Sequence, residues 1–219
     1  MELKTKQRTV AVFDFDGTLT RRDTLLPFLR RAYGAPRTSM ALLASSLMMA
    51  RGIVAGGQER DAAKEAVLSR LLAGRQVDEL DAAAKVFADV VIEKGLRAAV
   101  LERVQWHATS GHELVIVTAS PELYVRPIGE RLGFDAVLGT RLETDGAGRL
   151  TGRLVGHNCR GDEKVERLRA WLGPDAATGA VTVHAYGDSS GDRQLLAFAD
   201  HAYWVRGGRL RPAGVPTSA

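Results

Sequence analysis

Residues 10–20, VAVFDFDGTLT, place two aspartates directly after an apolar run. Val10 to Phe13 form a continuous apolar segment, which is typical of a strand covered on both faces. Asp14 and Asp16 are two residues apart, so their side chains share one side of an extended chain. Neighbouring carboxylates repel each other and resist burial unless a cation lies nearby. The stretch therefore predicts a buried strand that ends at a cation site.

Three further apolar runs predict strands, and helical segments separate them. The predicted strands are ELVIVTAS (113–120), AVTVHAY (180–186) and HAYWV (201–205), and the predicted helices include 121–133 and 162–173. Such alternation predicts an α/β fold with a Rossmann-like, doubly wound parallel sheet. Residues 136–155 instead show two alternating runs around Asp145-Gly146, which predicts a β-hairpin. We expect the final residues, 211–219, to be frayed.

Residues 24–95 contain no strand pattern and predict an inserted helical module. Val77, Leu80, Ala84, Phe87 and Val91 recur at helical spacing and form one apolar stripe. The segments 38–51 and 59–73 also predict helices. We therefore predict a core formed by residues 1–22 and 97–219, with a helical module inserted over residues 23–96.

Composition is that of an ordinary globular chain of 219 residues, with 45% hydrophobic and 26% charged residues. The net charge of +4 is small against 30 basic and 26 acidic residues, and no basic run is interleaved with aromatics, so we expect no nucleic-acid partner. The single Cys159 excludes an intrachain disulfide. The apolar stretch 40–56 is interrupted at Arg51, and the N-terminal residues are polar without a signal-peptide pattern. We expect a cytoplasmic protein with no stable membrane insertion.

Polar groups stand where three predicted strands end. Asp14 and Asp16 follow the first strand, Thr118 lies in the second, and Asp188 and Asp192 lie in GDSSGD after the third. Parallel strands bring their carboxyl ends to one edge of the sheet, where ligands bind. Carboxylate oxygens gathered there suit Mg²⁺.

These segments together resemble the haloacid dehalogenase-like (HAD) hydrolases. DFDGTLT, VIVTAS, Lys164 in RGDEKVERL, and YGDSSGD match four motifs of that family in order. The helical insertion after the first motif resembles the cap of the phosphoserine-phosphatase branch, subfamily IB. This resemblance implies a catalytic core over residues 1–22 and 97–219 and a helical cap over residues 23–96. TASPE, the C-x-G-x-x-K stretch and GDSSGD are also similar to HAD-type phosphatidylglycerophosphate phosphatases.

The resemblance implies a magnesium-dependent phosphatase and a role for each motif residue. Asp14 would be the nucleophile that forms an aspartyl-phosphate, and Asp16 the general acid and base. Mg²⁺ would be held by the Asp14 carboxylate, the Asp16 carbonyl and Asp188. Thr118 and Lys164 would bind the phosphoryl oxygens. Asp192 would orient the metal site or Lys164.

Two of these positions have alternatives in the sequence itself. Lys164 stands in the first turn of a predicted helix, where a cation opposes the helix dipole unless an anion binds there. The alternative is a solvated lysine in a charged run. Ser120 competes with Thr118 for the second motif. Because Ser120 precedes Pro121 and Glu122, we predict that it caps the next helix, which leaves Thr118 for phosphate.

Candidates for substrate selection are weaker. Asp23 stands where phosphoserine phosphatases carry the longer Glu, which argues against phosphoserine; its alternative role is a helix cap. Lys64 would face a substrate head group or be a solvated surface lysine. The segment LLASSLMMA (42–50) would form cap core or, alternatively, an acyl-binding surface. We expect the five histidines to be structural or exposed and Cys159 to be a buried side chain.

The sequence thus predicts hydrolysis of a small phosphorylated metabolite. Three alternatives stay open at this point. They are a phosphatase acting on a phospholipid head group at a membrane surface, a phosphotransferase, and a binding protein that kept the fold.

Overall fold

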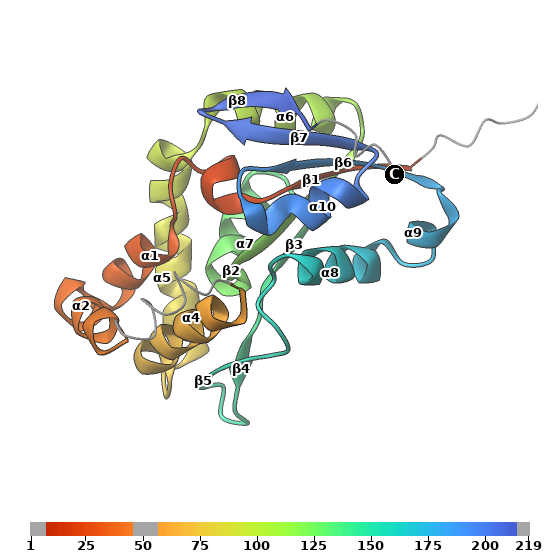
Figure 1. Cartoon of the computed structure of the whole chain (residues 1–219). Helices are drawn as coiled ribbons and strands as arrows, with labels where there is room; N and C mark the ends of the chain where they lie inside the picture. Colours follow the sequence, from red (N-terminus) through yellow and green to blue (C-terminus); the bar gives the residue numbers. More distant parts are fainter. Residues whose placement is uncertain (1–7, 46–56, 214–219) are drawn as a thin grey trace, which may run out of the picture.

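The computed structural model describes residues 8–45 and 57–213, and the side chains of residues 57–64 and 177 lie outside that description. A six-stranded sheet in the order β3-β2-β1-β6-β7-β8 forms its centre (Figure 1). Its strands are β1 (Arg8–Phe13), β2 (Glu113–Pro121), β3 (Ala136–Thr140), β6 (Val181–Gly187), β7 (His201–Arg206) and β8 (Arg209–Pro212). All neighbours pair in parallel except β7 and β8. The predicted α/β fold and its four predicted strands are confirmed.

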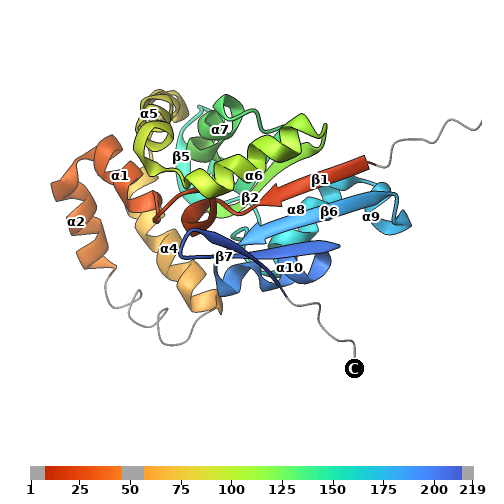
Figure 2. The same cartoon turned by 90° about the horizontal axis from the view of Figure 1, so that it is seen from above.

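The sheet is covered on both faces, as the apolar run of β1 predicts. Val10 and Val12 pack in one core cluster, and Ala11 and Phe13 pack in the other. Helices α6 (Ala98–Thr109) and α7 (Glu122–Arg131) cover one face, and α8 (Asp162–Leu172) and α10 (Arg193–Phe198) cover the other (Figure 2). The short helix α9 (Asp175–Thr178) precedes β6. Because the chain winds from β1 outward to β3 and then returns to β6, the sheet order reverses beside β1, where ligands bind in such folds.

The predicted β-hairpin is confirmed with shorter bounds, and the prediction of a frayed end at residues 211–212 is wrong. Within 136–155, the first part is not half of a hairpin, because β3 pairs in parallel with β2. The hairpin is shorter and consists of β4 (Leu142–Thr144) and β5 (Leu150–Leu154). At the C-terminal end, Arg211 and Pro212 are not frayed, since they pair with β7 in the edge strand β8. Residues 214–219 lie outside the described part.

The described residues of the inserted segment form four α-helices at one end of the sheet (Figure 1). They are α1 (Leu25–Tyr33), α2 (Ala35–Ala44), α4 (Gly57–Leu72) and α5 (Val77–Val90). The predicted stripe on α5 is confirmed by the burial of Leu80, Ala84 and Phe87. The sequence pattern did not predict α1. Of the predicted helix 38–51, the part after residue 45 lies outside the described residues.

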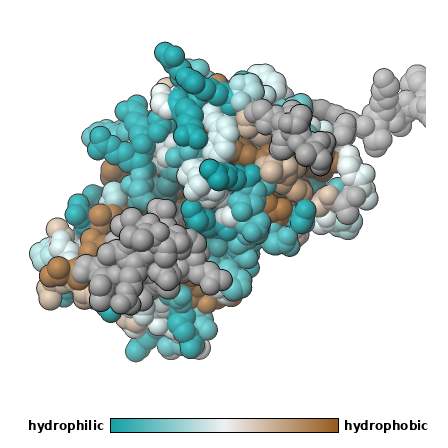
Figure 3. All heavy atoms as spheres, viewed as in Figure 1, coloured by the Kyte–Doolittle hydropathy of each residue, from teal (hydrophilic) through white to brown (hydrophobic). Residues whose placement is uncertain are grey.

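The apolar segment 42–50 is described only to residue 45. Leu43 is 75% exposed, so this side chain belongs neither to a cap core nor to an enclosed acyl site. On the face drawn in Figure 3, hydrophilic residues spread over most of the surface with smaller hydrophobic areas between them. Among the described helices, none is long and apolar enough to cross a membrane.

The β4–β5 hairpin packs on the inserted helices rather than on the sheet. The Gly74 amide donates to the Leu150 carbonyl, and the Leu150 amide donates to the Arg75 carbonyl, both at 2.8 Å. Gly152 faces Ser69 of α4 so closely that a Cβ would lie 2.8 Å from the Ser69 Cα. A segment between β3 and α8 therefore reaches across and completes the helical part.

A group of histidines lies between α6, β6 and β7. The rings of His107 and His184 are 4.9 Å apart and those of His184 and His201 are 4.4 Å apart, measured between centroids. His107 is fully buried, with its Nε2 2.8 Å from the Tyr186 hydroxyl and its Nδ1 2.8 Å from His112 Nδ1. The expected structural role fits His107.

Burial of this group predicts a loss of stability in acid. Burial first, and then neighbouring histidines and Arg103, lower the pKa of His107 to about 3, and burial and His201 lower that of His184 to about 4, with Asp200 acting weakly in the opposite direction. These histidines therefore bind protons more tightly in the unfolded chain than in the folded one. Their full contribution to the free energy of unfolding is present above about pH 6.5 and is lost as pH falls toward 4.

We expect the free energy of unfolding of wild type, measured with urea, to fall by about 1–2 kcal/mol more between pH 7 and pH 5 than that of His107→Gln. Carboxylates elsewhere titrate in both proteins, so the difference isolates the histidine. Equal pH dependence in the two proteins would contradict this account.

Candidate active site

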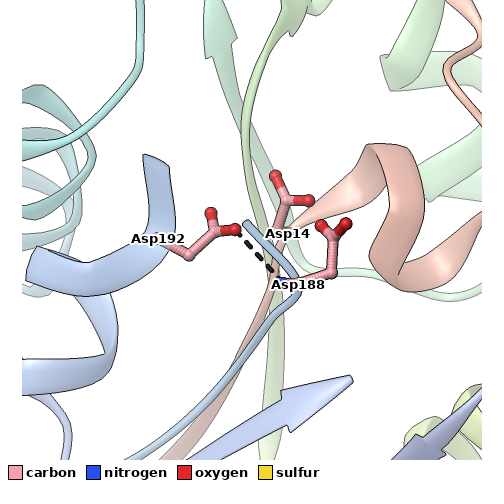
Figure 4. A group of neighbouring side chains, drawn as sticks. All are labelled: Asp14, Asp188 and Asp192. Carbon is pink, nitrogen blue, oxygen red and sulfur yellow. Dashed lines mark hydrogen bonds between the residues drawn. The ribbon is translucent and has the colours of Figure 1, made fainter. Parts of the chain in front are cut away.

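Three carboxylates converge at the edge of the sheet where β1 and β6 end (Figure 4). Asp14 directly follows β1, Asp188 follows β6, and Asp192 closes the short turn Ser190–Asp192. One oxygen from each lies within 4.8 Å of the others. Asp14 and Asp192 are buried and Asp188 is half-buried. The parallel sheet thus brings together residues far apart in the sequence, as predicted.

Lys164 reaches this group from the first turn of α8. Its Nζ lies 2.5 Å from Asp14 Oδ1 and 2.6 Å from Asp192 Oδ1, and the side chain is 2% exposed. The alternative of a solvated lysine is therefore wrong. Burial alone would lower the pKa of Lys164, but Asp14 and Asp192 outweigh it and raise the pKa above its ordinary value. Lys164 is a buried cation held by two carboxylates.

Asp192 organises the loop as well as the lysine. Its Oδ2 accepts hydrogen bonds from the amides of Asp188 (3.2 Å) and Ser189 (2.9 Å) and from the Ser189 hydroxyl (2.9 Å). Burial would raise the pKa of Asp192, but Lys164 and the Ser189 groups lower it overall. With both oxygens engaged, Asp192 fits the predicted role of orienting its neighbours.

The group carries more negative charge than its lysine neutralises. Burial and Asp192 raise the pKa of Asp14 and of Asp188, although Lys164 acts in the opposite direction at both carboxylates. At Asp188, the Thr18 hydroxyl donates to Oδ1 at 3.2 Å. Surplus charge on hard carboxylate oxygens is the donor set that Mg²⁺ prefers, so the residues present fit that ion.

Gly17 allows Asp188 to approach the turn after β1. Gly17 has φ of 86°, and a Cβ there would lie 2.3 Å from Asp188 Oδ2. Arg97 fixes the same turn, since its Nε lies 2.9 Å from the Gly17 carbonyl oxygen and 3.1 Å from that of Thr20. Sequence reasoning missed the role of Arg97 in this turn.

Asp16 faces a set of hydroxyl groups. Its Oδ2 accepts a hydrogen bond from Ser120 Oγ at 2.5 Å, and its Oδ1 accepts from the Thr24 amide at 2.8 Å and the Thr24 hydroxyl at 2.7 Å. Burial first, and then Asp23, raise the pKa of Asp16 to about 6, although these hydrogen bonds act in the opposite direction. Asp16 is thus held at both oxygens.

The predicted capping role of Ser120 is wrong. β2 continues to Pro121, and α7 begins at Glu122 without a side-chain cap. Ser120 therefore lies at the strand end, where its hydroxyl meets Asp16. Thr118 is also buried there, and its Oγ1 accepts a hydrogen bond from the Ser120 amide at 3.0 Å. A phosphate-binding role for Thr118 stays a prediction.

Of the two candidates for substrate selection, only Asp23 has a described side chain, and its charge acts on Asp16. Asp23 is exposed, and its Oδ1 accepts a hydrogen bond from the Leu25 amide at 3.0 Å, which matches the alternative of a helix cap. Lys64 lies in α4, and its side chain is outside the described part. Cys159 is buried, and burial raises the pKa of its thiol to about 11, so it is not poised as a nucleophile.

Comparison with known proteins gives consistent matches. The model of the haloacid dehalogenase-like hydrolase family matches residues 11–197. Protein CicA of Caulobacter vibrioides is 41% identical over 192 residues, covering 87% of this chain and 83% of that protein. A solved structure from Bordetella pertussis Tohama I, of unknown function, is 29% identical with a TM-score of 0.73, covering 87% and 86% of the two chains. A phosphoserine phosphatase, solved as a phospho-aspartyl intermediate analogue, shares the fold with a TM-score of 0.60 at 20% identity, over 89% and 84%.

The close approach of Asp188 to Gly17 predicts that alanine destabilises the protein more at position 17 than at a glycine with free space around it. Gly133 has φ of 78° and no atom within 4 Å of an added Cβ, so it is a matched control with the same backbone strain. We expect Gly17→Ala to lower the free energy of unfolding, measured with urea, by about 1–3 kcal/mol more than Gly133→Ala. Equal losses would show that Asp188 moves aside at no cost.

Proposed function

The chain belongs to the haloacid dehalogenase-like hydrolase family, and we propose that it hydrolyses a phosphate monoester through a phosphorylated Asp14. The observation that carries this proposal is the buried Lys164 in contact with Asp14. A carboxylate at a strand end, paired with a cation and close to two further carboxylates, is arranged to receive a dianionic phosphoryl group.

The proposed reaction has two steps. An Asp14 carboxylate oxygen attacks phosphorus, the bond from phosphorus to the leaving oxygen breaks, and Asp16 gives that oxygen a proton. A water molecule then attacks the aspartyl-phosphate while Asp16 takes a proton from it. The bond from phosphorus to Asp14 breaks, and inorganic phosphate leaves. Lys164 and Thr118 would hold the phosphoryl oxygens during both steps.

Asp14 and Asp188, with the Asp16 carbonyl, would hold Mg²⁺. The surplus negative charge of the carboxylate group supports this assignment. When bound, the ion supplies charge neutralisation at the phosphoryl oxygens. Asp192 serves by holding Lys164 and the loop of Asp188.

We place the cap at residues 23–96 and the core at residues 1–22 and 97–219. Backbone hydrogen bonds between the two connecting segments support these bounds. The Arg21 amide donates to the Gly95 carbonyl at 2.8 Å, and the Arg97 amide donates to the Leu19 carbonyl at 2.9 Å. The β4–β5 hairpin extends from the core to complete the cap. A cap of this kind excludes water and selects the leaving group.

A small phosphorylated metabolite is the substrate class we propose. The fold shared with a phosphoserine phosphatase supports the class, while the exposed, shorter Asp23 argues against phosphoserine itself. The resemblance to phosphatidylglycerophosphate phosphatases stays a prediction.

Loss of the nucleophile should abolish the reaction. We expect Asp14→Asn to reduce phosphate release from 4-nitrophenyl phosphate at least about 1,000-fold, because the amide cannot form the aspartyl-phosphate. Asp78→Asn, at an exposed position on α5, makes the same chemical change away from the site and should keep wild-type turnover. Thermal unfolding checks that both variants fold. Wild-type turnover by Asp14→Asn would refute the nucleophile assignment.

Metal dependence follows from the charge balance of the site. We expect EDTA to stop phosphate release and added Mg²⁺ to restore it. Asp188→Asn should raise the Mg²⁺ concentration for half-maximal rate by about tenfold or more, because it removes one charged ligand. Turnover that is unaffected by EDTA and by this substitution would remove Mg²⁺ from the proposal.

A further inference from the structure

The hydroxyls of Tyr124, Ser120 and Thr24 form a ring of close polar contacts with the Asp16 carboxylate. The Tyr124 hydroxyl donates to Ser120 Oγ at 2.7 Å and lies 3.0 Å from Thr24 Oγ1. Ser120 and Thr24 each donate to a different oxygen of the Asp16 carboxylate. Tyr124 is fully buried and does not contact Asp16 through any described hydrogen bond of its own. Its hydroxyl instead links the two side chains that fix the carboxylate.

The ring of Tyr124 packs against the inserted helices. Phe28 of α1 stacks on it with centroids 4.6 Å apart and an interplanar angle of 18°. Phe87 of α5 meets it edge-on, with centroids 6.0 Å apart. Thr24 immediately precedes α1, so the cap also supplies one member of the ring of polar contacts. Tyr124 itself lies on α7 of the core.

The inserted helices therefore hold the ring of Tyr124, while its hydroxyl contacts the side chains that bind Asp16. A buried phenol needs one hydrogen-bond partner, and here its hydroxyl lies between two hydroxyls that share the same carboxylate. Tyrosine has only two side-chain torsions to order, so stacking of its ring fixes the position of its hydroxyl. Proton transfer to a leaving group depends strongly on such alignment.

We propose that Tyr124 is a positioning residue that aligns Asp16 for proton transfer when α1 and α5 pack on its ring. This inference rests on the proposed function, because it requires Asp16 to be the general acid. Tyr124 acts through Ser120 and Thr24 and does not touch the substrate. The cap thereby acts on the chemistry as well as on access to the site.

The proposal predicts a dependence on the leaving group. As the bond from phosphorus to oxygen breaks, Asp16 delivers its proton to the departing oxygen. Phenolate needs that proton more than 2,4-dinitrophenolate, which is a stable anion. Misalignment of Asp16 should therefore slow the reaction of phenyl phosphate far more than that of 2,4-dinitrophenyl phosphate. A general loss of structure would slow both.

The experiment measures kcat/KM of Tyr124→Phe with phenyl, 4-nitrophenyl and 2,4-dinitrophenyl phosphate. We expect a loss of about tenfold or more for phenyl phosphate and less than about twofold for 2,4-dinitrophenyl phosphate. Tyr186→Phe is the matched control, since Tyr186 is equally buried and its hydroxyl bonds His107 away from the site. It should leave the leaving-group dependence unchanged.

Two further variants test the link to the cap. Phe28→Leu keeps an apolar side chain but removes the stacked ring, and should steepen the leaving-group dependence without altering any polar group at Asp16. The double variant Phe28→Leu/Tyr124→Phe should lose less than the product of the single losses, because both changes act through one link. Ser120→Ala breaks the same ring and provides the test if Tyr124→Phe does not fold.

The outcomes separate this inference from the proposed function. Equal losses across the three phosphates in Tyr124→Phe, or a steeper dependence in Tyr186→Phe as well, would overturn the positioning role alone. Full additivity with Phe28→Leu would overturn the link to the cap. Failure of the wild type to release phosphate from any of the three, or undiminished release by Asp14→Asn, would overturn the proposed function and this inference with it.

Discussion

The buried contact of Lys164 with Asp14 and Asp192 is the interaction on which the site depends. A charge removed from water is costly unless it is paired, and removing one partner from a buried pair is strongly destabilising. Here the pairing ties together the end of β1, the first turn of α8 and the loop after β6. The same arrangement leaves carboxylate charge uncompensated at Asp14 and Asp188. The geometry that holds the fold together at this edge is therefore also the geometry on which the proposed binding of a metal ion and a phosphoryl group would depend.

A second constraint lies where the inserted helices join the part of the chain that holds the sheet. The turn after β1 carries Gly17 against Asp188 on one side, and Arg97 binds its carbonyl oxygens on the other. From this turn the chain enters the inserted helices, and Arg97 lies where the chain returns to the sheet. Asp16 lies between the two regions, held by Ser120 from the core and Thr24 from the start of α1. The inserted helices therefore contribute directly to the surroundings of Asp16.

Much of the site was predictable because its residues stand at the ends of apolar strands. Asp14, Asp188, Asp192 and Lys164 were all singled out, and the structure brings the four together. Ser120 was misassigned because proline and glutamate after it mimic a helix start, while β2 in fact extends to Pro121. Tyr124, Thr24 and Arg97 were missed because they act through contacts between segments distant in sequence, for which local patterns carry no signal.

The sequence by itself determined the alternation of strands and helices, the inserted helical segment and the carboxylates at the strand ends, because these follow from local periodicity and residue type. Only the tertiary structure decided that β3 joins the parallel sheet, that residues 142–154 pack on the inserted helical segment, and that Arg211 and Pro212 continue the sheet edge. Strand pairing depends on which distant segment supplies the partner hydrogen bonds, and an apolar run of a few residues is compatible with several partners.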